Sequence, residues 1–494
     1  MNDQPEGNPA GVGPVGRWGR GWAAPTVVFF TSAAVLVLEI LAGRLVAPYV
    51  GVSLETYTGI IGTVLAGMAL GSAAGGRIAD RYDPRALLGP LLIAAGISSL
   101  LSLPIIATLG PEVARSGGGP AGIVILAVTA FVLPTALLSA VSPMVAKLRL
   151  VSTAETGTVV GGLSAAGTAG ALVGTFATGF VLIAAVPTRP IVTAVGIGLA
   201  AVGVLVSLRL RRRPRPWVAV GLVLAAALAQ AVPSPCQRET AYYCVAVVTD
   251  EARPSGRVLL LDNLRHSYVD LRDPTYLEFR YTSLFADVVD ATLEAGPLDA
   301  RHIGGGGFTF PRWLEATRPG STSTVLELDA DVVAIAEQEL GLEPGPWLRV
   351  RTGDARLNIA KEPSTAFDLV VGDAFGGLSV PWHLTTTEMV AEVARALRPG
   401  GVYVLNVIDG GPQRLVRAEL ATLAATFEHV ALVAPPDGPN GNHVLVASDA
   451  PITLGPIGRA DGVAVTGEAL DRFIGNARAL RDDFAPVDQL ITRR

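Results

Sequence analysis

Residues 301–307 read Arg-His-Ile-Gly-Gly-Gly-Gly, a short strand pattern that runs directly into four glycines. Glycine carries no side chain, so a run of glycines lets the main chain approach a bound molecule closely. Strands that end in this way are typical of nucleotide-binding α/β sheets, although a plain turn would use the same residues. The stretch therefore predicts a strand that ends at a ligand site.

Acidic residues follow three further predicted strands. These strands end in Glu327-Leu328-Asp329, Gly353-Asp354-Ala355 and Gly372-Asp373-Ala374-Phe375. In dinucleotide-binding folds an acid about twenty residues after the glycines holds a ribose diol. Each acid alone could be a solvated helix cap. Four strand ends in register, however, match the spacing of a nucleoside cleft.

The pattern around these motifs alternates between strands and helices. Strands are predicted at 301–303, 323–328, 348–352, 367–372, 401–407, 427–433 and 443–447, with helices between them, for example at 330–340 and 386–397. This order implies a Rossmann-like α/β domain with a mostly parallel, doubly wound sheet that binds ligands at the carboxyl ends of its strands. A small β-hairpin, 243–248 with 257–261, is predicted to precede it.

Composition divides the chain upstream of this domain. Only 16% of the 494 residues are charged, against about a quarter in an ordinary soluble protein. Charges are scarce from 23 to 232 and return to normal density from 237 to 494. We predict a disordered Gly/Pro-rich segment at 1–22, a multi-pass α-helical membrane domain at 23–232 and the α/β domain at 237–494. The net charge of −5 suggests no nucleic-acid partner.

The lipid bilayer is the partner expected for the first half. A membrane helix needs roughly 20 apolar residues, and seven spans are predicted, near 24–43, 57–76, 86–109, 121–146, 158–183, 187–208 and 217–232. Basic residues gather before span one and after spans two, four and six. The positive-inside rule then places the N-terminus in the cytoplasm of a cell-membrane protein. If the short seventh span crosses, the α/β domain lies outside the cytoplasm.

Two segments of the membrane half are similar to known transporters. The connection Gly76-Arg77-Ile78-Ala79-Asp80-Arg81 resembles the loop signature of major facilitator transporters, in which an acid and basic residues latch neighbouring helices. Together with residues 38–44, it resembles bacterial proteins described as fused facilitator/spermidine synthases. Small residues at every fourth position, Gly67, Gly71 and Gly75, predict close helix packing, with a substrate path as the alternative.

The α/β motifs, with the leading hairpin, Leu261-Asp262-Asn263 and Tyr276-Leu277-Glu278, resemble the spermidine synthase domain of polyamine aminopropyltransferases. That resemblance implies transfer of an aminopropyl group from decarboxylated S-adenosylmethionine to a small-molecule amine. It implies that Asp373 is catalytic and that the nucleoside is bound by Gly304, Gly306, Glu327, Asp354 and Ala355. Candidate acceptor-site residues are Tyr243, His266, Tyr276 and His383, although single histidines beside loops are often ordinary hydrogen-bonding residues.

Several positions depart from the family pattern. An acid of the family is replaced by Gly307, a second acid by Gly376, a histidine by Leu277 and a glutamine by Tyr243. Because a buried ammonium without a paired charge is penalised by several kcal/mol, we expect a diamine to bind poorly. A non-catalytic polyamine or nucleoside sensor associated with transport is one alternative. An S-adenosylmethionine-dependent methyltransferase is another, although its glycine spacing would require a small residue in place of Phe308.

The remaining chemistry-bearing residues are few. The only cysteines, Cys236 and Cys244, follow the seventh span, and either a disulfide or two free thiols fits them. Five histidines and two cysteines provide no ligand set for a metal. The sequence leaves open whether the chain forms a homo-oligomer.

Overall fold

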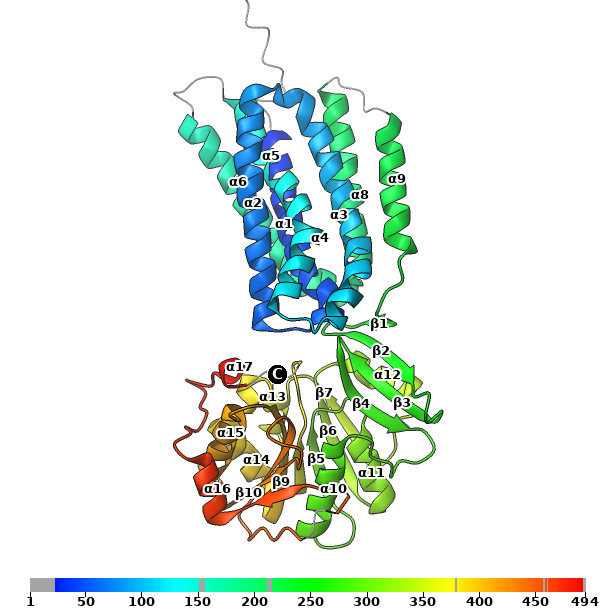
Figure 1. The fold of residues 1–494 in the computed structure, drawn as a ribbon, viewed down its shortest axis with the longest axis vertical. Coiled ribbons are helices and arrows are strands. Elements are labelled where there is room, and N and C mark those ends of the chain that lie inside the picture. The colour runs from blue at the N-terminus through cyan, green and yellow to red at the C-terminus, as the bar shows by residue number, and fades with distance from the viewer. Residues whose placement is uncertain are drawn as a thin grey trace, which may run out of the picture. The chain divides into compact units, whose positions relative to one another are not determined.

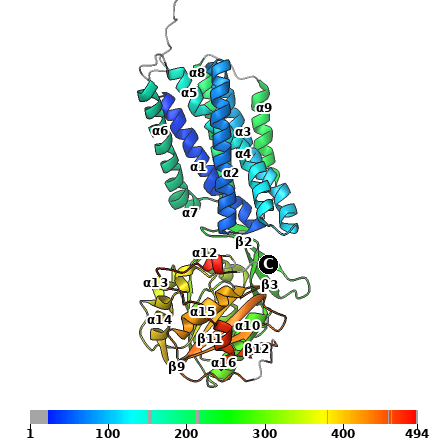
Figure 2. The ribbon, with the colours of Figure 1, turned by 60° about the vertical axis from the view of Figure 1, so that its left-hand side comes forward.

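The computed structural model describes residues 23–150, 156–210, 216–377, 380–455, 458–459 and 461–491. The segment 1–22, which we predicted to be disordered, lies outside these ranges. The chain divides into two compact units, one up to Pro235 and one from Cys236 onward. This division falls between the predicted domains. Figures 1 and 2 show a helical first unit and a second unit built on a sheet.

Within the described residues of the first unit, six helical segments are long and apolar enough to cross a membrane. They are α1 (Ala23–Val50), α2 (Leu54–Arg81), α3 (Pro84–Arg115), α4 with α5 (Pro120–Ser139 and Val141–Arg149), α6 with η2 and α7 (Thr156–Ala177, Thr178–Leu182 and Ile183–Ala185), and α8 (Thr188–Arg209). Each corresponds to one of the first six predicted spans.

The seventh predicted span, 217–232, corresponds to α9 (Pro216–Ala231). This helix has 16 residues, fewer than the roughly 20 that a bilayer core requires. Arg189, near the start of α8, donates from Nη2 to the carbonyls of Ala229 (2.7 Å) and Val232 (2.6 Å). These bonds satisfy carbonyls at the end of α9 that have no partner within the helix.

Glycines set the closest helix contacts of this unit. A Cβ atom on Gly71 would lie 2.0 Å from the Ala136 carbonyl oxygen of α4, and one on Gly67 would lie 2.1 Å from Thr135 Oγ1. Likewise, Gly170 of α6 has room for no side chain because the Phe29 carbonyl oxygen of α1 would lie 2.0 Å from its Cβ. The predicted small-residue positions therefore allow backbones to pack directly against each other.

Among the described residues, an ion pair links the end of α2 to α5. Asp80 near the end of α2 accepts from Lys147 Nζ of α5 at 2.9 Å. Both side chains are more than half exposed, so the pair adds at most about 1 kcal/mol to stability.

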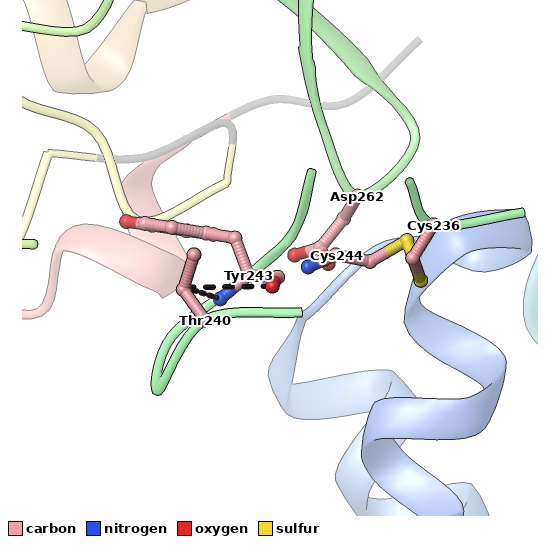
Figure 3. The surroundings of a disulfide bond; sticks show 5 residues. All are labelled: Cys236, Thr240, Tyr243, Cys244 and Asp262. Atoms are coloured by element: carbon pink, nitrogen blue, oxygen red, sulfur yellow. Dashed lines mark hydrogen bonds between the residues drawn. A yellow bond between two sulfur atoms is a disulfide. The ribbon is translucent and has the colours of Figure 1, made fainter. Parts of the chain in front are cut away.

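The second unit begins with a four-stranded antiparallel sheet in the order β1-β2-β3-β4, where the strands are β1 (Arg238–Glu239), β2 (Cys244–Thr249), β3 (Gly256–Leu261) and β4 (Leu264–Asp270). The predicted hairpin is β2 with β3. A disulfide joins Cys236 to Cys244 and closes the loop that leads into β2 (Figure 3). Inside that loop, the Thr240 hydroxyl oxygen accepts from the amide of Tyr243 at 2.9 Å.

The main sheet has eight strands in the order β12-β10-β11-β9-β8-β5-β6-β7. Their bounds are β5 Asp299–Ile303, β6 Thr322–Glu327, β7 Leu348–Thr352, β8 Phe367–Gly372, β9 Leu397–Asp409, β10 His429–Ala434, β11 Gly441–Ser448 and β12 Val463–Val465. Neighbouring strands are parallel across the part of the sheet that runs β9-β8-β5-β6-β7. The remaining strands, β11, β10 and β12, are each antiparallel to their neighbours. The order reverses at β5, where doubly wound sheets bind their ligands.

Helices cover both faces of this sheet (Figure 1). Apolar side chains of α10 (Arg280–Thr292) and α11 (Thr309–Thr317) share a buried cluster with strand residues such as Val371 and Val404. The opposite face is covered by α14 (Thr387–Ala396) and α15 (Arg414–Ala424). This Rossmann-type arrangement holds the ends of β5, β6 and β8 at one edge.

Candidate active site

A cavity lies at the carboxyl ends of β5, β6 and β8. Nine of the ten predicted site residues line it, namely Tyr243, His266, Gly304, Gly306, Glu327, Asp354, Ala355, Asp373 and His383. They come from strand ends and loops that are far apart in the sequence. The sheet brings them together because parallel strands deliver their carboxyl ends to one edge.

The glycine run shapes one wall of the cavity. Gly304 and Gly306 have φ values of +97° and +49°, which glycine adopts without steric cost. A side chain on Gly304 would also meet the Asp373 carbonyl oxygen at 2.4 Å. The loop therefore requires glycine here both for its turn and for its closeness to the end of β8.

The Glu327 carboxylate anchors this loop from the end of β6. Its Oε2 accepts from the amides of Gly305 (2.9 Å) and Gly306 (3.1 Å), and its Oε1 accepts from the amide of Asp329 (2.9 Å). A carboxylate has about four acceptor positions. Glu327 can therefore fix the glycine loop and still accept a hydroxyl from a ligand in the cavity.

Asp373, at the end of β8, has two neutral hydrogen-bond donors. Its Oδ2 accepts from the Tyr281 hydroxyl at 3.0 Å, and its Oδ1 accepts from Asn406 Nδ2 at 2.9 Å. Burial raises the pKa of Asp373 to about 6, and the two hydrogen bonds oppose that rise. At neutral pH the group is thus mostly ionised, yet more basic than an ordinary aspartate, as a general base should be.

The Asp354 carboxylate makes two contacts, one with a helix N-terminus and one with a histidine. Its Oδ1 caps the short helix α13 (Ala355–Ile359) by accepting from the Leu357 amide at 3.0 Å. Its Oδ2 lies 3.0 Å from His383 Nε2. We had predicted Asp354 for the nucleoside and His383 for the acceptor amine. The structure instead brings the two into direct contact on one side of the cavity.

Two further side chains complete the wall. The Tyr243 hydroxyl donates to the Phe375 carbonyl at 3.4 Å, and burial raises the pKa of this tyrosine. His266 lies beside the glycine loop, with its Nδ1 buried and without a hydrogen-bond partner. Burial lowers the pKa of His266 to about 4. The ring is therefore neutral at physiological pH.

Tyr276 is the one predicted site residue that the structure places elsewhere. Its hydroxyl donates to Glu278 Oε2 at 2.6 Å, and the Arg253 guanidinium lies 3.6 Å from the centre of its ring. These contacts hold Tyr276 outside the group that lines the cavity. A cation–π contact and a charged acceptor together account for this orientation.

Two residues that touch Asp373 were not predicted. Tyr281 comes from α10 and Asn406 from β9. Asn406 did carry a signal, because it is a single polar residue in the run Gly-Val-Tyr-Val-Leu-Asn-Val of a buried strand. Buried polar groups are usually hydrogen-bonded, so a partner at the strand end could have been expected. Nothing comparable distinguishes Tyr281.

The departures from the family pattern have different structural settings. A Cβ atom on Gly307 would lie 2.8 Å from Ser267 Cβ, so an aspartate would not fit there without movement. Around Gly376, by contrast, the nearest atom to a Cβ is Pro381 Cγ at 4.0 Å. Gly376 lines the cavity and leaves room for a side chain. Among the described residues, no group of three His, Cys, Asp or Glu side chains could hold a metal.

The sequence comparison found relatives named polyamine aminopropyltransferase. The polyamine aminopropyltransferase of Vibrio vulnificus is 35% identical over 127 residues, which cover 25% of this chain and 42% of that protein. That of Chromobacterium violaceum is 28% identical over 145 residues, or 29% of this chain and 54% of that protein. The C-terminal half has spermidine synthase-like homologues. The matches span about half the length of these relatives, and no family model matches the chain.

Solved structures of the same kind cover the C-terminal half. A probable spermidine synthase from Corynebacterium glutamicum is 28% identical with a TM-score of 0.46, and the match covers 50% of this chain and 95% of that one. The spermidine synthase from Thermotoga maritima is 17% identical with a TM-score of 0.35, over 53% of this chain and 82% of that one. The sequence relatives support a transferase, and the spermidine synthase-like half contains the cavity.

Proposed function

We propose that the C-terminal unit transfers an aminopropyl group from decarboxylated S-adenosylmethionine to an amine. The observation that carries this proposal is the buried Asp373 carboxylate, whose pKa is raised to about 6 beside the glycine loop and Glu327. The sequence relatives named polyamine aminopropyltransferase support the same reaction.

Each wall of the cavity has a role in this reaction. Gly304, Gly306 and Glu327 hold the nucleoside, with Glu327 accepting a ribose hydroxyl. Asp354, already paired with His383, and Ala355 face the base. Asp373 orients the acceptor amine and accepts its proton. Tyr281 and Asn406 do not react but hold the Asp373 carboxylate in place through their hydrogen bonds.

The chemical step is a displacement. The amine nitrogen, having lost a proton to Asp373, attacks the carbon beside the sulfonium, and the carbon–sulfur bond breaks. Its electron pair stays on sulfur, so methylthioadenosine leaves as a neutral thioether. An amine with a pKa near 10 is mostly protonated at pH 7, so a basic carboxylate and a fixed geometry are what the protein must supply.

The acceptor pocket favours an amine other than a diamine dication. Gly376 and Gly307 place no carboxylate where the family pattern has one, and Leu277 packs beside the α10 cluster. A second ammonium would therefore be buried without a paired charge, which costs several kcal/mol. We propose that the acceptor carries a single amine or an uncharged second end.

The test is release of methylthioadenosine by the purified full chain, with a panel of monoamines and diamines. Product from at least one amine is expected, and Asp373→Asn should lower kcat by about 10²–10⁴-fold, the usual contribution of a general base. No product from any amine, beside an active soluble relative assayed in parallel, would sink the proposal.

A second candidate is a non-catalytic sensor that binds a polyamine or nucleoside. The glycines at 307 and 376 favour it because they remove the acids of a diamine site. Calorimetric titration distinguishes the two functions: binding without turnover supports the sensor, whereas turnover that Asp373→Asn abolishes excludes it. A methyltransferase would require a small residue in place of Phe308. The Phe308 ring is large and packs beneath Gly305 in the buried core, so this position does not favour a methyltransferase.

We further propose that the N-terminal unit inserts in the cell membrane with its N-terminus in the cytoplasm, and that its facilitator-like latch joins α2 to α5. Six crossings return the C-terminal unit to the cytoplasm, where a sulfonium nucleoside is available. A seventh, by α9, would place the unit outside, where the Cys236–Cys244 disulfide is favoured. A reporter fused after residue 494 separates the two: a cytoplasmic signal supports the transferase, and an external signal supports the sensor.

A further inference from the structure

A second cavity of about 480 Å³ lies in the C-terminal unit, away from the proposed active site. It is enclosed by α15, the end of α16 (Gly467–Ile474), the segment 476–486 and α17 (Val487–Leu490). Figure 1 shows these three helices on one side of the unit. No residue lines both cavities. Its volume falls within the ~300–1,000 Å³ typical of small-molecule sites.

The charges in this cavity all have one sign. Arg414, Arg417 and Arg478 line it, and none of its lining residues is acidic. Arg414 donates to the Gln489 carbonyl at 3.3 Å. The Nε of Arg417 is buried and has no hydrogen-bond acceptor. Within the part of the chain that the structure describes, Arg478 makes no hydrogen bond or ion pair.

An unsatisfied buried guanidinium nitrogen requires a physical explanation, because such groups are rarely left without an acceptor. The Arg417 guanidinium lies over the Phe473 ring, 4.8 Å from its centre. A guanidinium held against an aromatic face keeps its N–H edge available for a carboxylate or phosphate. Arg417 lines the cavity, and none of the described residues supplies an acceptor to its Nε.

The rest of the cavity wall is apolar. Ile474, Leu480 and Phe484 line it together with the arginines. Phe484 is 67% exposed, although an aromatic side chain of this size is usually largely buried in a folded protein. A ligand with an apolar group would cover this ring while its charged end meets the arginines.

We propose that this cavity binds a small amphipathic oxyanion, a carboxylate or phosphate attached to an apolar group. Arginine recognises both oxyanions through paired N–H donors, and the apolar wall selects a ligand that is more than a free inorganic ion. The inference is independent of the proposed transferase activity, since it uses no residue of the active site.

The test is isothermal titration calorimetry of the full chain with four probes: phenyl phosphate, phenylacetate, inorganic phosphate and the neutral 2-phenylethanol. Phenyl phosphate and phenylacetate should bind more tightly than the other two. Arg478→Gln, at an exposed position, should weaken phenyl phosphate binding by about tenfold, as expected for one charged hydrogen-bonding partner. Arg417→Lys, which keeps the charge and loses the paired donors, should also weaken it.

Arg472→Gln is the matched control, because Arg472 is an exposed arginine of α16 that bonds the Glu468 carbonyl and does not line the cavity. It should leave binding unchanged. Equal weakening by Arg472→Gln and Arg478→Gln would overturn the site. Equal affinity for phenyl phosphate and inorganic phosphate would also overturn it, because the apolar wall would then contribute nothing. Equal affinity for phenyl phosphate and 2-phenylethanol would do the same, because the arginines would then contribute nothing.

Discussion

The Asp373 carboxylate receives hydrogen bonds from a phenol and an amide rather than from a cation. A cation would have lowered its pKa strongly, whereas neutral donors only offset part of the rise that burial causes. The carboxylate is therefore held in position and remains basic. The Asn406 side chain is itself oriented by Asn442, whose Nδ2 donates to Asn406 Oδ1 at 3.0 Å.

Tyr281→Phe should shift the acid side of the pH profile of kcat/KM to higher pH. Activity requires the ionised carboxylate, so it rises as the pH passes the Asp373 pKa of about 6. The Tyr281 hydroxyl stabilises the ionised form, and its removal raises that pKa. Tyr276→Phe is the control, because the Tyr276 hydroxyl bonds Glu278 outside the cavity. An acid limb that stays in place in Tyr281→Phe would contradict this role.

Gly376→Asp should improve the use of a diamine such as putrescine. The position lines the cavity and has room for a side chain, so a carboxylate there can pair with the second ammonium. We expect KM for putrescine to fall by about tenfold, as for one charged hydrogen bond, with little change for a monoamine. Gly455→Asp, at an exposed glycine with open space around it, adds the same charge elsewhere. If both variants respond alike, the pairing is refuted.

At the residue scale, strand-end motifs predicted most of the cavity. Gly304, Glu327 and Asp373 follow strands of one parallel sheet, so local pattern was enough to place them at the same edge. The Asp354–His383 contact could not be predicted, because it depends on how the segment after β8 folds back toward α13. The family resemblance selected Tyr276, whereas tertiary packing directs Tyr281 of α10 toward Asp373.

At the scale of helices, α2 and α4 approach each other closely at Gly71. Gly71→Ala should destabilise the helical unit by about 1–3 kcal/mol, the usual cost of overpacking, because its Cβ would overlap the Ala136 carbonyl. Gly76→Ala in the same helix meets no neighbour within 4 Å and should be neutral or stabilising, since alanine favours helix by about 1 kcal/mol. Thermal unfolding of the detergent-solubilised chain measures both. Equal melting temperatures would show that α2 and α4 are not tightly packed here.

Helices and strands with strong periodicity were predicted well, and short ones were not. The parallel strands and the hairpin of β2 with β3 follow from apolar runs that turns separate. By contrast, β1 has two residues and β12 has three, too few for a pattern. The strand β4 was missed because Leu-Arg-His-Ser-Tyr-Val-Asp mixes polar and apolar residues, and pairing with β3 stabilises it regardless. The helix α9, predicted as a seventh span, is shorter than a bilayer requires.

At the scale of the whole chain, the change in composition near residue 235 coincides with the boundary between the two compact units. Large apolar side chains such as Phe180 and Leu65 are exposed on the helical unit, as expected for a surface that faces lipid. We therefore expect the full chain to stay in the membrane fraction after washing with alkaline carbonate and to be released by detergent. Residues 237–494 expressed alone are the comparison. Release of the full chain by carbonate would contradict membrane insertion.

The disulfide stands at the first residue of the C-terminal unit, where the polypeptide arrives from α9. Any pulling force transmitted along the backbone reaches Cys236 and passes through the sulfur atoms into β2 at Cys244. The intervening turn, which holds the Thr240–Tyr243 hydrogen bond (Figure 3), is bypassed and bears none of the load. We therefore expect the crosslink to keep a pulling force on the backbone away from this turn, and so from Tyr243 at the cavity wall.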